Sequence, residues 1–465
     1  MKVVFINPLV DRHKIYGRFH KIGGLMPPLG VAYIAAMLEK HGYAPAILDA
    51  NALQLEPTEA AEAALRLKPD LIGVTCTTAS YYAGREFARK LKELAPDLPI
   101  CIGGPHVLGS EKIVLDDDLC WDYVISGEGE YSTLDLIQTL ENGGDLSQVK
   151  GLSYRDNGQP RVNPEREMAQ NLDELPFPAR HLLPPIDTYR LKAIDYRRLP
   201  STQMLTSRGC PYRCIFCRTS FGKTTRFHSP EYVVAEIEHL MREYGVREVK
   251  INDDTFIVSR DRVMKICQLI IDKKLDILWS CNVRSNLVDR ELLLAMKKAG
   301  CWGVAVGLES ASDEILKALK KGATVAQGIK ACKLAYELGF SVRPSFIIGS
   351  PLETEETIEA TIRLARDLPT HFPVFTLMTP FPGTEMWETA NTFGTFDGSD
   401  FNKLLVGRRA SFIPKGLTAE YLEKKCREAY FRTYLTPGMI WRHLKRVRSY
   451  RDAKLLFDGF RGLLG

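Results

Sequence analysis

Three cysteines on one short segment constrain this chain more than any other feature. Cys210, Cys214 and Cys217 are spaced C-x3-C-x2-C, and Phe216 precedes the last of them. Cysteine thiolates are the usual ligands of iron–sulfur clusters, and four of them close an electron-transfer centre. Three thiolates on one tight loop hold three irons of a cubane and leave the fourth iron open. The spacing therefore predicts a [4Fe–4S] cluster with one position left for a substrate or cosubstrate.

A zinc site is the alternative for such a loop. Zinc sites prefer C-x2-C pairs with a second pair elsewhere in the chain, and the sequence has no second pair. The other cysteines show no further cluster spacing, and free cysteine is among the most buried residue types, so we expect them in the core. They are Cys76, Cys101, Cys120, Cys267, Cys281, Cys301, Cys332 and Cys426.

Length and composition indicate a globular protein with two or three domains. The chain has 465 residues, 45% of them hydrophobic and 26% charged, and domains usually run to about 100–200 residues. No run of about 18 apolar residues is present, and the start of the chain lacks the pattern of a signal peptide. The cysteines do not form the disulfide framework of a short secreted chain. We therefore expect a cytoplasmic protein.

The net charge of +5 is concentrated in the C-terminal tail. Between Arg442 and Leu464 seven basic residues stand against two acidic ones, a difference of +5 that equals the excess of the whole chain. The rest is close to neutral, so binding to nucleic acid is not indicated. Apolar side chains such as Trp441 and Phe460 alternate with these bases, and a basic amphipathic helix can lie on an anionic membrane. The alternative is a solvated helix that docks on the rest of the protein.

Residues 1–145 alternate between strand and helix patterns, which predicts a doubly wound parallel sheet. The expected strands are Lys2–Ile6, Ala46–Leu48, Leu71–Thr75, Ile100–Gly103 and Tyr123–Ser126. Such sheets bind ligands at the carboxyl ends of their strands. Candidate contacts at these ends are Gly103, Gly104, His106, Gly127 and Glu128. Glycines there let a flat, bulky ligand lie close to the backbone, whereas His106 is either a rim contact or an internally bonded loop histidine.

The rest of the chain predicts three further parts. Residues 146–200 are expected to form a hairpin and a linker, 201–384 a partial (β/α)6 TIM-like barrel, and 385–465 C-terminal helices. The expected barrel strands are Met204–Thr206, Val249–Asn252, Leu278–Val283, Gly303–Gly307, Val342–Ile348 and Val374–Met378. Because chemistry in parallel barrels takes place where strands end, the cysteines would lie at the barrel mouth.

Polar residues follow the later barrel strands. Asn252, Asp253 and Asp254 could bind an ammonium group, although Asp254 is also a candidate helix cap. Arg284 is suited to pair with a carboxylate if it points into the barrel. Glu309 is suited to ribose hydroxyls, and the small residues around Gly349 leave room for an adenine edge. None of these is specific alone, but their order behind the cysteine loop is informative.

Together these segments resemble a known family. The cysteine loop, Asp253-Asp254-Thr255-Phe256 and Gly307-Leu308-Glu309-Ser310 resemble a radical S-adenosylmethionine (SAM) core, and Gly103-Gly104-Pro105-His106 and Gly127-Glu128-Gly129-Glu130 resemble a cobalamin-binding domain. The combination is similar to the B12-binding radical SAM proteins, the branch that includes the anaerobic magnesium-protoporphyrin monomethyl ester cyclase and cobalamin-dependent methylases.

The resemblance implies an enzyme that generates a 5′-deoxyadenosyl radical from SAM at a [4Fe–4S] cluster, with Phe216 among the residues that contact the cofactors. Cobalamin-dependent methylation of an unactivated carbon is the expected reaction. Radical cyclisation, dehydration or rearrangement without methyl transfer is the alternative, and a non-catalytic cobalamin or Fe–S sensor is a third. The implied partners are a small-molecule substrate such as a lipid or tetrapyrrole, and an electron donor such as flavodoxin or ferredoxin. No catalytic residue is assigned, and the tail leaves peripheral membrane contact open.

One segment departs from the family pattern. Many cobalamin domains offer a histidine to cobalt from a D-x-H-x-x-G loop, and this chain has Asp11-Arg12-His13-Lys14-Ile15-Tyr16-Gly17, which is one residue too long. We interpret the match as accidental. Cobalamin would then bind without ligation by His13.

Overall fold

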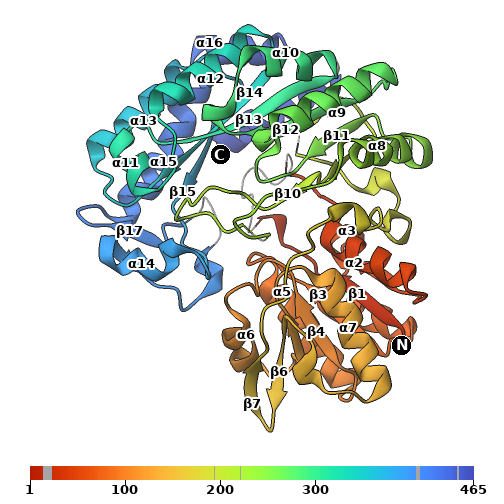
Figure 1. The fold of residues 1–465 in the computed structure, drawn as a ribbon. Helices are drawn as coiled ribbons and strands as arrows, with labels where there is room; N and C mark the ends of the chain where they lie inside the picture. The colour runs from red at the N-terminus through yellow and green to blue at the C-terminus, as the bar shows by residue number, and fades with distance from the viewer. Residues whose placement is uncertain (14–22, 193, 220, 405–408, 448–449, 465) are drawn as a thin grey trace. The chain divides into compact units, whose positions relative to one another are not determined.

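A computed structural model provides the structure and describes residues 1–13, 23–192, 194–219, 221–404, 409–447 and 450–464. The chain divides into two units (Figure 1). The first comprises Met1–Asp11 and Pro27–Tyr189, and the second comprises Arg12–Met26 and Arg190–Gly465. The predicted four-part division of the chain remains a prediction.

The first unit is built on a seven-stranded sheet with strand order β2-β1-β3-β4-β5-β6-β7. Its strands are β1 (Val3–Asn7), β2 (Ala46–Asp49), β3 (Leu71–Thr75), β4 (Ile100–Gly103), β5 (Tyr123–Ile125), β6 (Leu152–Asp156) and β7 (Gln159–Val162). The first five are parallel, and the hairpin β6–β7 adds two antiparallel strands. The hairpin was expected, but its place in this sheet was not. The order reverses between β1 and β3, which is where doubly wound sheets bind ligands.

Helices of the first unit lie on both faces of this sheet. They are α2 (Leu29–Lys40), α3 (Ala50–Leu53), α4 (Pro57–Arg66), α5 (Tyr81–Leu94), α6 (Glu111–Asp117) and α7 (Gly129–Asn142). Val3 and Phe5 of β1 pack with Val31 of α2 and Ile137 of α7, while α4 pairs with α5. Successive residues of a strand point to opposite faces of the sheet. Because helices cover both faces here, the strands are continuous apolar runs in the sequence.

The second unit contains a six-stranded parallel sheet of order β15-β14-β13-β12-β11-β8. The strands are β8 (Ser201–Met204), β11 (Glu248–Ile251), β12 (Leu278–Val283), β13 (Cys301–Glu309), β14 (Ser341–Ile348) and β15 (Val374–Leu377). The expected first strand, Met204–Thr206, begins three residues too late. Its neighbour β11 supplies the pairing from Ser201 onward. The partial barrel is confirmed.

Helices cover the outer face of this sheet (Figure 1). They are α8 (Pro230–Tyr244), α9 (Arg260–Asp272), α10 (Arg290–Lys298), α11 (Asp313–Ala318), α12 (Val325–Glu337) and α13 (Glu355–Asp367). Several begin at side-chain caps that the sequence supplies: Ser229, Asp289 and Thr324 accept a backbone N–H three residues ahead. Along β12, Trp279 and Cys281 are buried against this layer, whereas Ser280 and Asn282 point to the inner face.

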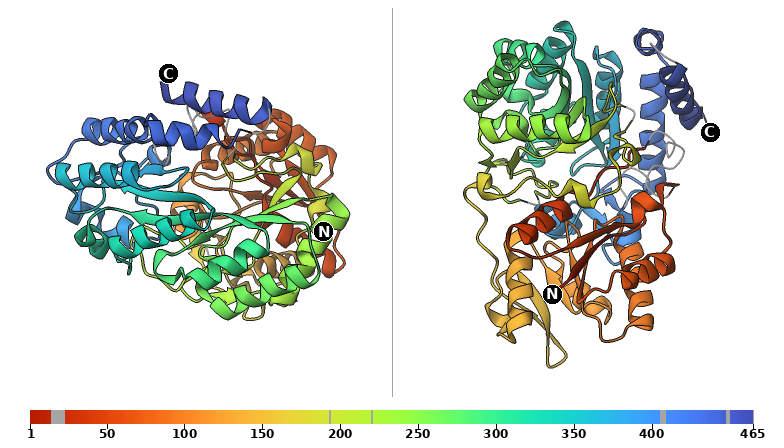
Figure 2. Two further views of the ribbon diagram at one scale, coloured as in Figure 1. Left: turned by 90° about the horizontal axis from the view of Figure 1, so that it is seen from above. Right: turned by 90° about the vertical axis from the view of Figure 1, so that its right-hand side faces the viewer.

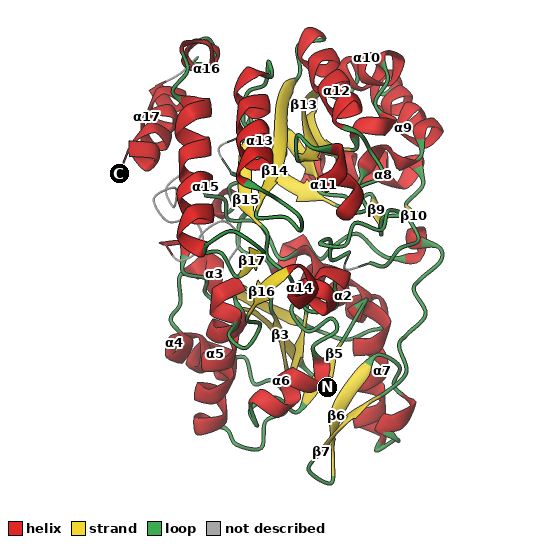
Figure 3. Ribbon diagram, turned by 90° about the vertical axis from the view of Figure 1, so that its left-hand side faces the viewer, coloured by secondary structure: helices red, strands yellow, loops and turns green. Residues whose placement is uncertain are grey.

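The C-terminal part is mostly helical, with α14 (Glu385–Phe393), α15 (Ala419–Tyr434), α16 (Pro437–Leu444) and α17 (Tyr450–Leu464). Helix α15 packs on α13 and β15 (Figure 2). An antiparallel ladder of β16 (Gly394–Phe396) and β17 (Phe412–Pro414) follows α14, which the sequence did not predict (Figure 3). None of the helices in the described ranges combines the length and the apolar character that a bilayer span requires.

Candidate active site

The cysteine loop leaves the sheet after β8 and closes on itself. Ser207–Arg208 (β9) pairs antiparallel with Arg226–Phe227 (β10), which fastens the two ends of the loop. Within it, Cys210 N–H donates to Gly222 O at 3.2 Å. A Cβ on Gly209 would lie 2.3 Å from Thr224 O, and its φ is +85°. The loop therefore needs glycine immediately before the first cysteine.

The three thiols lie at the inner surface of this loop with little exposure. Cys210 is 9% exposed and Cys214 8%, while Cys217 is half-buried. Burial raises the pKa of Cys217 to about 12, and the nearby Asp254, Cys214 and Cys210 add to the effect. Such thiols become thiolates only with a cation beside them. In the parts that the structure describes, no three His, Cys, Asp or Glu side chains converge on a single metal ion. This is compatible with a cubane, because each cysteine of a cubane binds a different iron.

Asp253 fixes the strand end that carries the loop. Its Oδ1 accepts the Thr206 N–H at 2.6 Å, and its Oδ2 accepts the hydroxyls of Thr206 and Ser207, both at 2.6 Å. The side chain is fully buried. Three donors use both of its oxygens, so Asp253 positions the loop, and its contact with a ligand's ammonium group stays a prediction.

Asn252 and Asp254 flank this anchor and are both exposed. Asn252 Nδ2 donates to Gln203 Oε1 at 3.0 Å. Surrounding protein and the neighbouring Asp253 raise the pKa of Asp254 to about 6. Of the three expected polar residues at this strand end, these two are open to a ligand.

Arg284, which directly follows β12, lies beside the cysteine loop, and its pairing with a carboxylate stays a prediction. Its Nη1 lies 4.0 Å from Cys214 Sγ, and its guanidinium carbon lies 3.4 Å from the ring centroid of Tyr212. The residue is only 5% exposed, yet Nε and Nη2 have no hydrogen-bond partner in the described structure. A buried guanidinium with unused donors fits an anionic group, whether a thiolate-bound cluster or a carboxylate of SAM.

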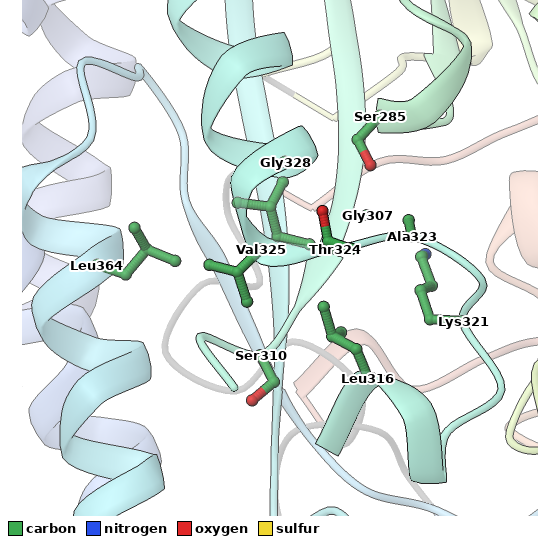
Figure 4. A pocket seen from close by; sticks show the side chains of 11 residues that line it. Ser285, Gly307, Ser310, Leu316, Lys321, Ala323, Thr324, Val325, Gly328 and Leu364 are labelled. Atoms are coloured by element: carbon green, nitrogen blue, oxygen red, sulfur yellow. The ribbon is translucent and has the colours of Figure 1, made fainter. Parts of the chain in front are cut away.

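Glu309 forms a buried ion pair that the sequence did not predict. Its Oε1 lies 2.5 Å from Lys321 Nζ, and the two residues are 6% and 8% exposed. Lys321 also lines a small cavity of about 10 Å³ together with Ser285 and Gly307, with room for about one water (Figure 4). Lys321 holds one oxygen of Glu309, so the proposed contact with ribose hydroxyls is left to the other oxygen.

Glu353 shapes the turn after β14 and was missed in the sequence. Its Oε2 accepts the N–H groups of Gly349 and Ser350 at 2.6 and 2.9 Å. Burial raises the pKa of Glu353 to about 8. The sequence does contain a signal for this residue: a carboxylate stands four residues after Gly349, and the N–H groups of a turn need an acceptor. The Gly349 turn is thus rigidly held, as an adenine contact requires.

Phe216 anchors the loop to the barrel mouth. With Ile215 it packs against Ile347 of β14 and Met378 beyond β15. Ile215 N–H also donates to Leu319 O at 3.1 Å. The aromatic residue before the last cysteine therefore has a packing partner in the fold, and its contact with a cofactor remains a proposal.

The tips of the first unit's strands contain the other candidates. Gly104 has a φ of +94°, and a Cβ there would lie 2.8 Å from Cys76 O. Gly103 and Gly127 meet no atom closer than 3.4 Å at the same position, and Glu128 Oε2 accepts the Ala169 N–H at 3.3 Å. Backbone at these tips is open to a flat ligand, which fits the predicted cobalamin.

His106 lies in the core of the first unit. It is fully buried, its Nδ1 is 3.3 Å from Thr78 Oγ1, and its ring is 4.1 Å from that of Tyr81. Of the two alternatives for His106, this environment favours the internally bonded histidine, and a contact with a ligand stays a prediction. His13 is exposed, and Lys14–Gly17 of its motif fall outside the described residues.

Replacing Gly209 tests whether the loop geometry governs the cluster. Gly209→Ala should reduce iron and sulfide per chain at least about tenfold after anaerobic reconstitution, because a Cβ collides with backbone oxygen. Gly245→Ala is the matched control, since its φ is also positive, at +62°, but its Cβ meets nothing within 4 Å. Equal loading of both variants would contradict the role of the loop.

Glu353 predicts a pH-dependent stability. Its pKa is about 8 in the folded chain against an ordinary 4.5, so the folded state binds the extra proton and stability falls as pH rises through this window. Glu353→Gln has no carboxyl group to titrate, so it does not lose stability in this way. Its melting temperature relative to the natural chain should therefore rise from about pH 5 to about pH 8. The exposed control Glu314→Gln should show no trend, and parallel pH profiles for Glu353→Gln would refute the assignment.

Comparisons with known proteins agree with this geometry. The family model of the radical SAM superfamily matches residues 204–365, and the family model of the B12 binding domain matches residues 17–137. An uncharacterized methyltransferase of Pyrococcus horikoshii is 37% identical over 446 residues, covering 95% of this chain and 94% of the relative. The anaerobic magnesium-protoporphyrin IX monomethyl ester cyclase of Rubrivivax gelatinosus is 29% identical, covering 86% of this chain and 72% of the relative.

Solved structures show the same fold. The cobalamin-dependent SAM radical enzyme OxsB, with aqua-cobalamin and SAM bound, has a TM-score of 0.76 at 18% identity, covering 99% of this chain and 71% of that one. The methyltransferase TsrM from Kitasatospora setae, with cobalamin and a [4Fe–4S] cluster bound, has a TM-score of 0.72 at 19% identity, covering 94% and 89%. The predicted fold class and resemblance are confirmed. The chain belongs to the radical SAM enzymes that carry a B12-binding domain, whose cofactors are a [4Fe–4S] cluster, SAM and cobalamin.

Proposed function

We propose that this enzyme methylates an unactivated carbon of a small molecule in a cobalamin-dependent radical SAM reaction. The observation that carries the proposal is the cysteine loop with Arg284 beside it, because that guanidinium keeps two unused donors next to Cys214. Two relatives support methyl transfer by name: the Pyrococcus protein and the cytidylyl-2-hydroxyethylphosphonate methyltransferase of Streptomyces wedmorensis.

We assign the cluster to Cys210, Cys214 and Cys217. When bound there, the cluster and SAM together supply the 5′-deoxyadenosyl radical, which abstracts hydrogen from a C–H bond. The chain's own residues would bind SAM and orient it. Arg284 would neutralise the SAM carboxylate, Asn252 and Asp254 would hold its ammonium group, and the turn at Gly349 would receive the adenine. Glu309 would contact the ribose through the oxygen that Lys321 leaves free.

The loop is also protected against quenching of a radical by water. Ile215 and Phe216 are packed into the apolar cluster at the ends of β14 and β15, and the first two cysteines are less than a tenth exposed. An enzyme that generates a carbon radical needs such exclusion of competing reactions. The protein thus supplies binding, orientation and a dry surface.

Radical cyclisation without methyl transfer is the second candidate. The cyclase of Rubrivivax gelatinosus supports it, because this relative covers most of the chain. It would also favour a tetrapyrrole substrate. A flavodoxin or ferredoxin is the proposed source of the electron. The cytoplasmic location and the contact of the basic tail with a membrane remain expectations from the sequence.

Turnover without added substrate tests the radical chemistry. Anaerobically reconstituted enzyme given SAM and dithionite should form 5′-deoxyadenosine, and Cys217→Ala should lower the rate by at least about a hundredfold, because one corner of the cluster loses its ligand. Cys332→Ala, a buried cysteine on α12, should retain iron and activity. A fully loaded natural enzyme that forms no 5′-deoxyadenosine would refute the proposal.

Transfer of the SAM methyl group separates methylation from cyclisation without methyl transfer, and retention of cobalamin tests the corrinoid site. The reconstituted enzyme should retain cobalamin by its absorbance and pass label from methyl-labelled SAM to the product. Gly104→Ala should release cobalamin while iron per chain stays constant, because a Cβ there pushes on Cys76 O. Gly42→Ala has a similar φ of +83° and an open Cβ position, so it should retain the corrinoid. An unlabelled product would contradict methyl transfer and favour cyclisation.

A further inference from the structure

The side chain of Arg284 reaches the cysteine loop from a rigid starting point. The residue directly follows β12, and its carbonyl oxygen accepts the Leu287 N–H at 3.0 Å. The side chain is 5% exposed, and among the described residues it has no carboxylate partner. A long arginine side chain must give up many rotamers to adopt one orientation. The remaining contacts of the guanidinium therefore decide where its donors point.

One face of this guanidinium is covered by the ring of Tyr212. The guanidinium carbon lies 3.4 Å from the ring centroid, so the two planar groups are in van der Waals contact. Arginine stacks on aromatic faces in this way, and the negative face of the ring attracts the cation. Within the described ranges the Tyr212 hydroxyl has no hydrogen bond. The ring itself, rather than its hydroxyl, supplies the contact.

Two further neighbours surround the nitrogens of the guanidinium. Nη1 lies 4.0 Å from Cys214 Sγ. A Cβ on Gly322 would lie 3.3 Å from Nη2, so the glycine keeps that nitrogen free of a crowding side chain. Nε and Nη2 have no partner in the described structure. With the ring on one face and a thiol beside Nη1, these two nitrogens are the donors left for a ligand.

The ring belongs to the segment that carries the cysteines. Tyr212 stands two residues after Cys210 and two before Cys214, and it is half-buried. Arg284 comes from a different part of the chain, at the end of β12. The position of the ring therefore depends on the conformation of the cysteine loop. Closure of that loop brings the ring onto a guanidinium that the sheet already holds nearby.

We propose that Tyr212 is a positioning residue for SAM, because its ring orients the Arg284 guanidinium so that Nε and Nη2 face the SAM carboxylate. The inference rests on the proposed function, which assigns that carboxylate to Arg284. Tyr212 acts through Arg284 and makes no contact of its own with the carboxylate. A guanidinium that is oriented in advance loses less freedom when the ligand binds, which favours affinity. The loop that holds the cluster thus also completes the carboxylate site.

Binding of SAM to the cluster-loaded enzyme tests the proposal. Equilibrium dialysis with the oxidised cluster measures Kd, because SAM is not cleaved without an electron. Tyr212→Leu should weaken SAM binding about tenfold or more, since the guanidinium loses its stacking partner. Its iron and sulfide per chain should equal those of the natural enzyme. Tyr212→Phe keeps the ring and should bind SAM like the natural enzyme.

A double-mutant cycle shows whether Tyr212 acts through Arg284. Arg284→Gln should weaken SAM binding by itself, because the carboxylate loses its charged partner. Adding Tyr212→Leu to Arg284→Gln should weaken binding no further, since residues that act as a unit are not additive. An equal loss from Tyr212→Leu in both backgrounds would assign the ring to SAM directly and would overturn the positioning role.

Tyr336→Leu is the matched control. Tyr336 is a half-buried tyrosine on α12, and its ring centroid lies 5.4 Å from that of His371. This variant should bind SAM like the natural enzyme. Natural affinity in Tyr212→Leu, weak binding by Tyr212→Phe, or loss of iron from Tyr212→Leu overturns the proposal. The assay needs no turnover, so an enzyme with the expected binding pattern that transfers no methyl group refutes the proposed function alone.

Discussion

One buried carboxylate determines where the cysteine loop begins. Asp253 accepts three hydrogen bonds from Thr206 and Ser207, at the point where the chain leaves β8 for the first cysteine. Burial raises the pKa of this acid, and the three donors offset that effect. A fully buried carboxylate is tolerable only when such donors are present. The anchor joins the ends of two neighbouring strands, so the loop is positioned by the rigid sheet.

Two ion pairs balance charge within the second unit. Glu309 and Lys321 neutralise each other, and Arg343 is matched by Asp195. Among the described residues, Arg284 has no carboxylate within hydrogen-bonding distance, whereas Lys250 Nζ lies 4.0 Å from Asp195 Oδ1 and donates to Asn282 Oδ1 at 3.3 Å. Both cations are almost fully buried. Of the two, only Arg284 has side-chain nitrogens without a partner in the described structure, so the position beside the cysteine loop is where we propose that an anionic group binds.

The sequence predicted the elements better than their side-chain partners. Strand and helix patterns gave both parallel sheets, and the spacing of the cysteines gave the loop, because these signals are local. The pairing of Glu309 with Lys321 and the burial of His106 under Tyr81 depend on segments distant in sequence. Asp253 and Asp254 are adjacent, and only the fold shows that the first is an anchor and the second is exposed. The turn acceptor Glu353 could have been found from its spacing after Gly349.

The most direct test of the account is electron–nuclear double resonance on the reduced cluster with SAM that carries ¹⁵N in its amino group. The account predicts a hyperfine coupling between that nitrogen and the cluster, since three cysteines leave one iron available. The coupling should be lost in a variant that cannot load the cluster. A loaded cluster with no nitrogen coupling, or with a fourth ligand from the protein, would contradict the central claim.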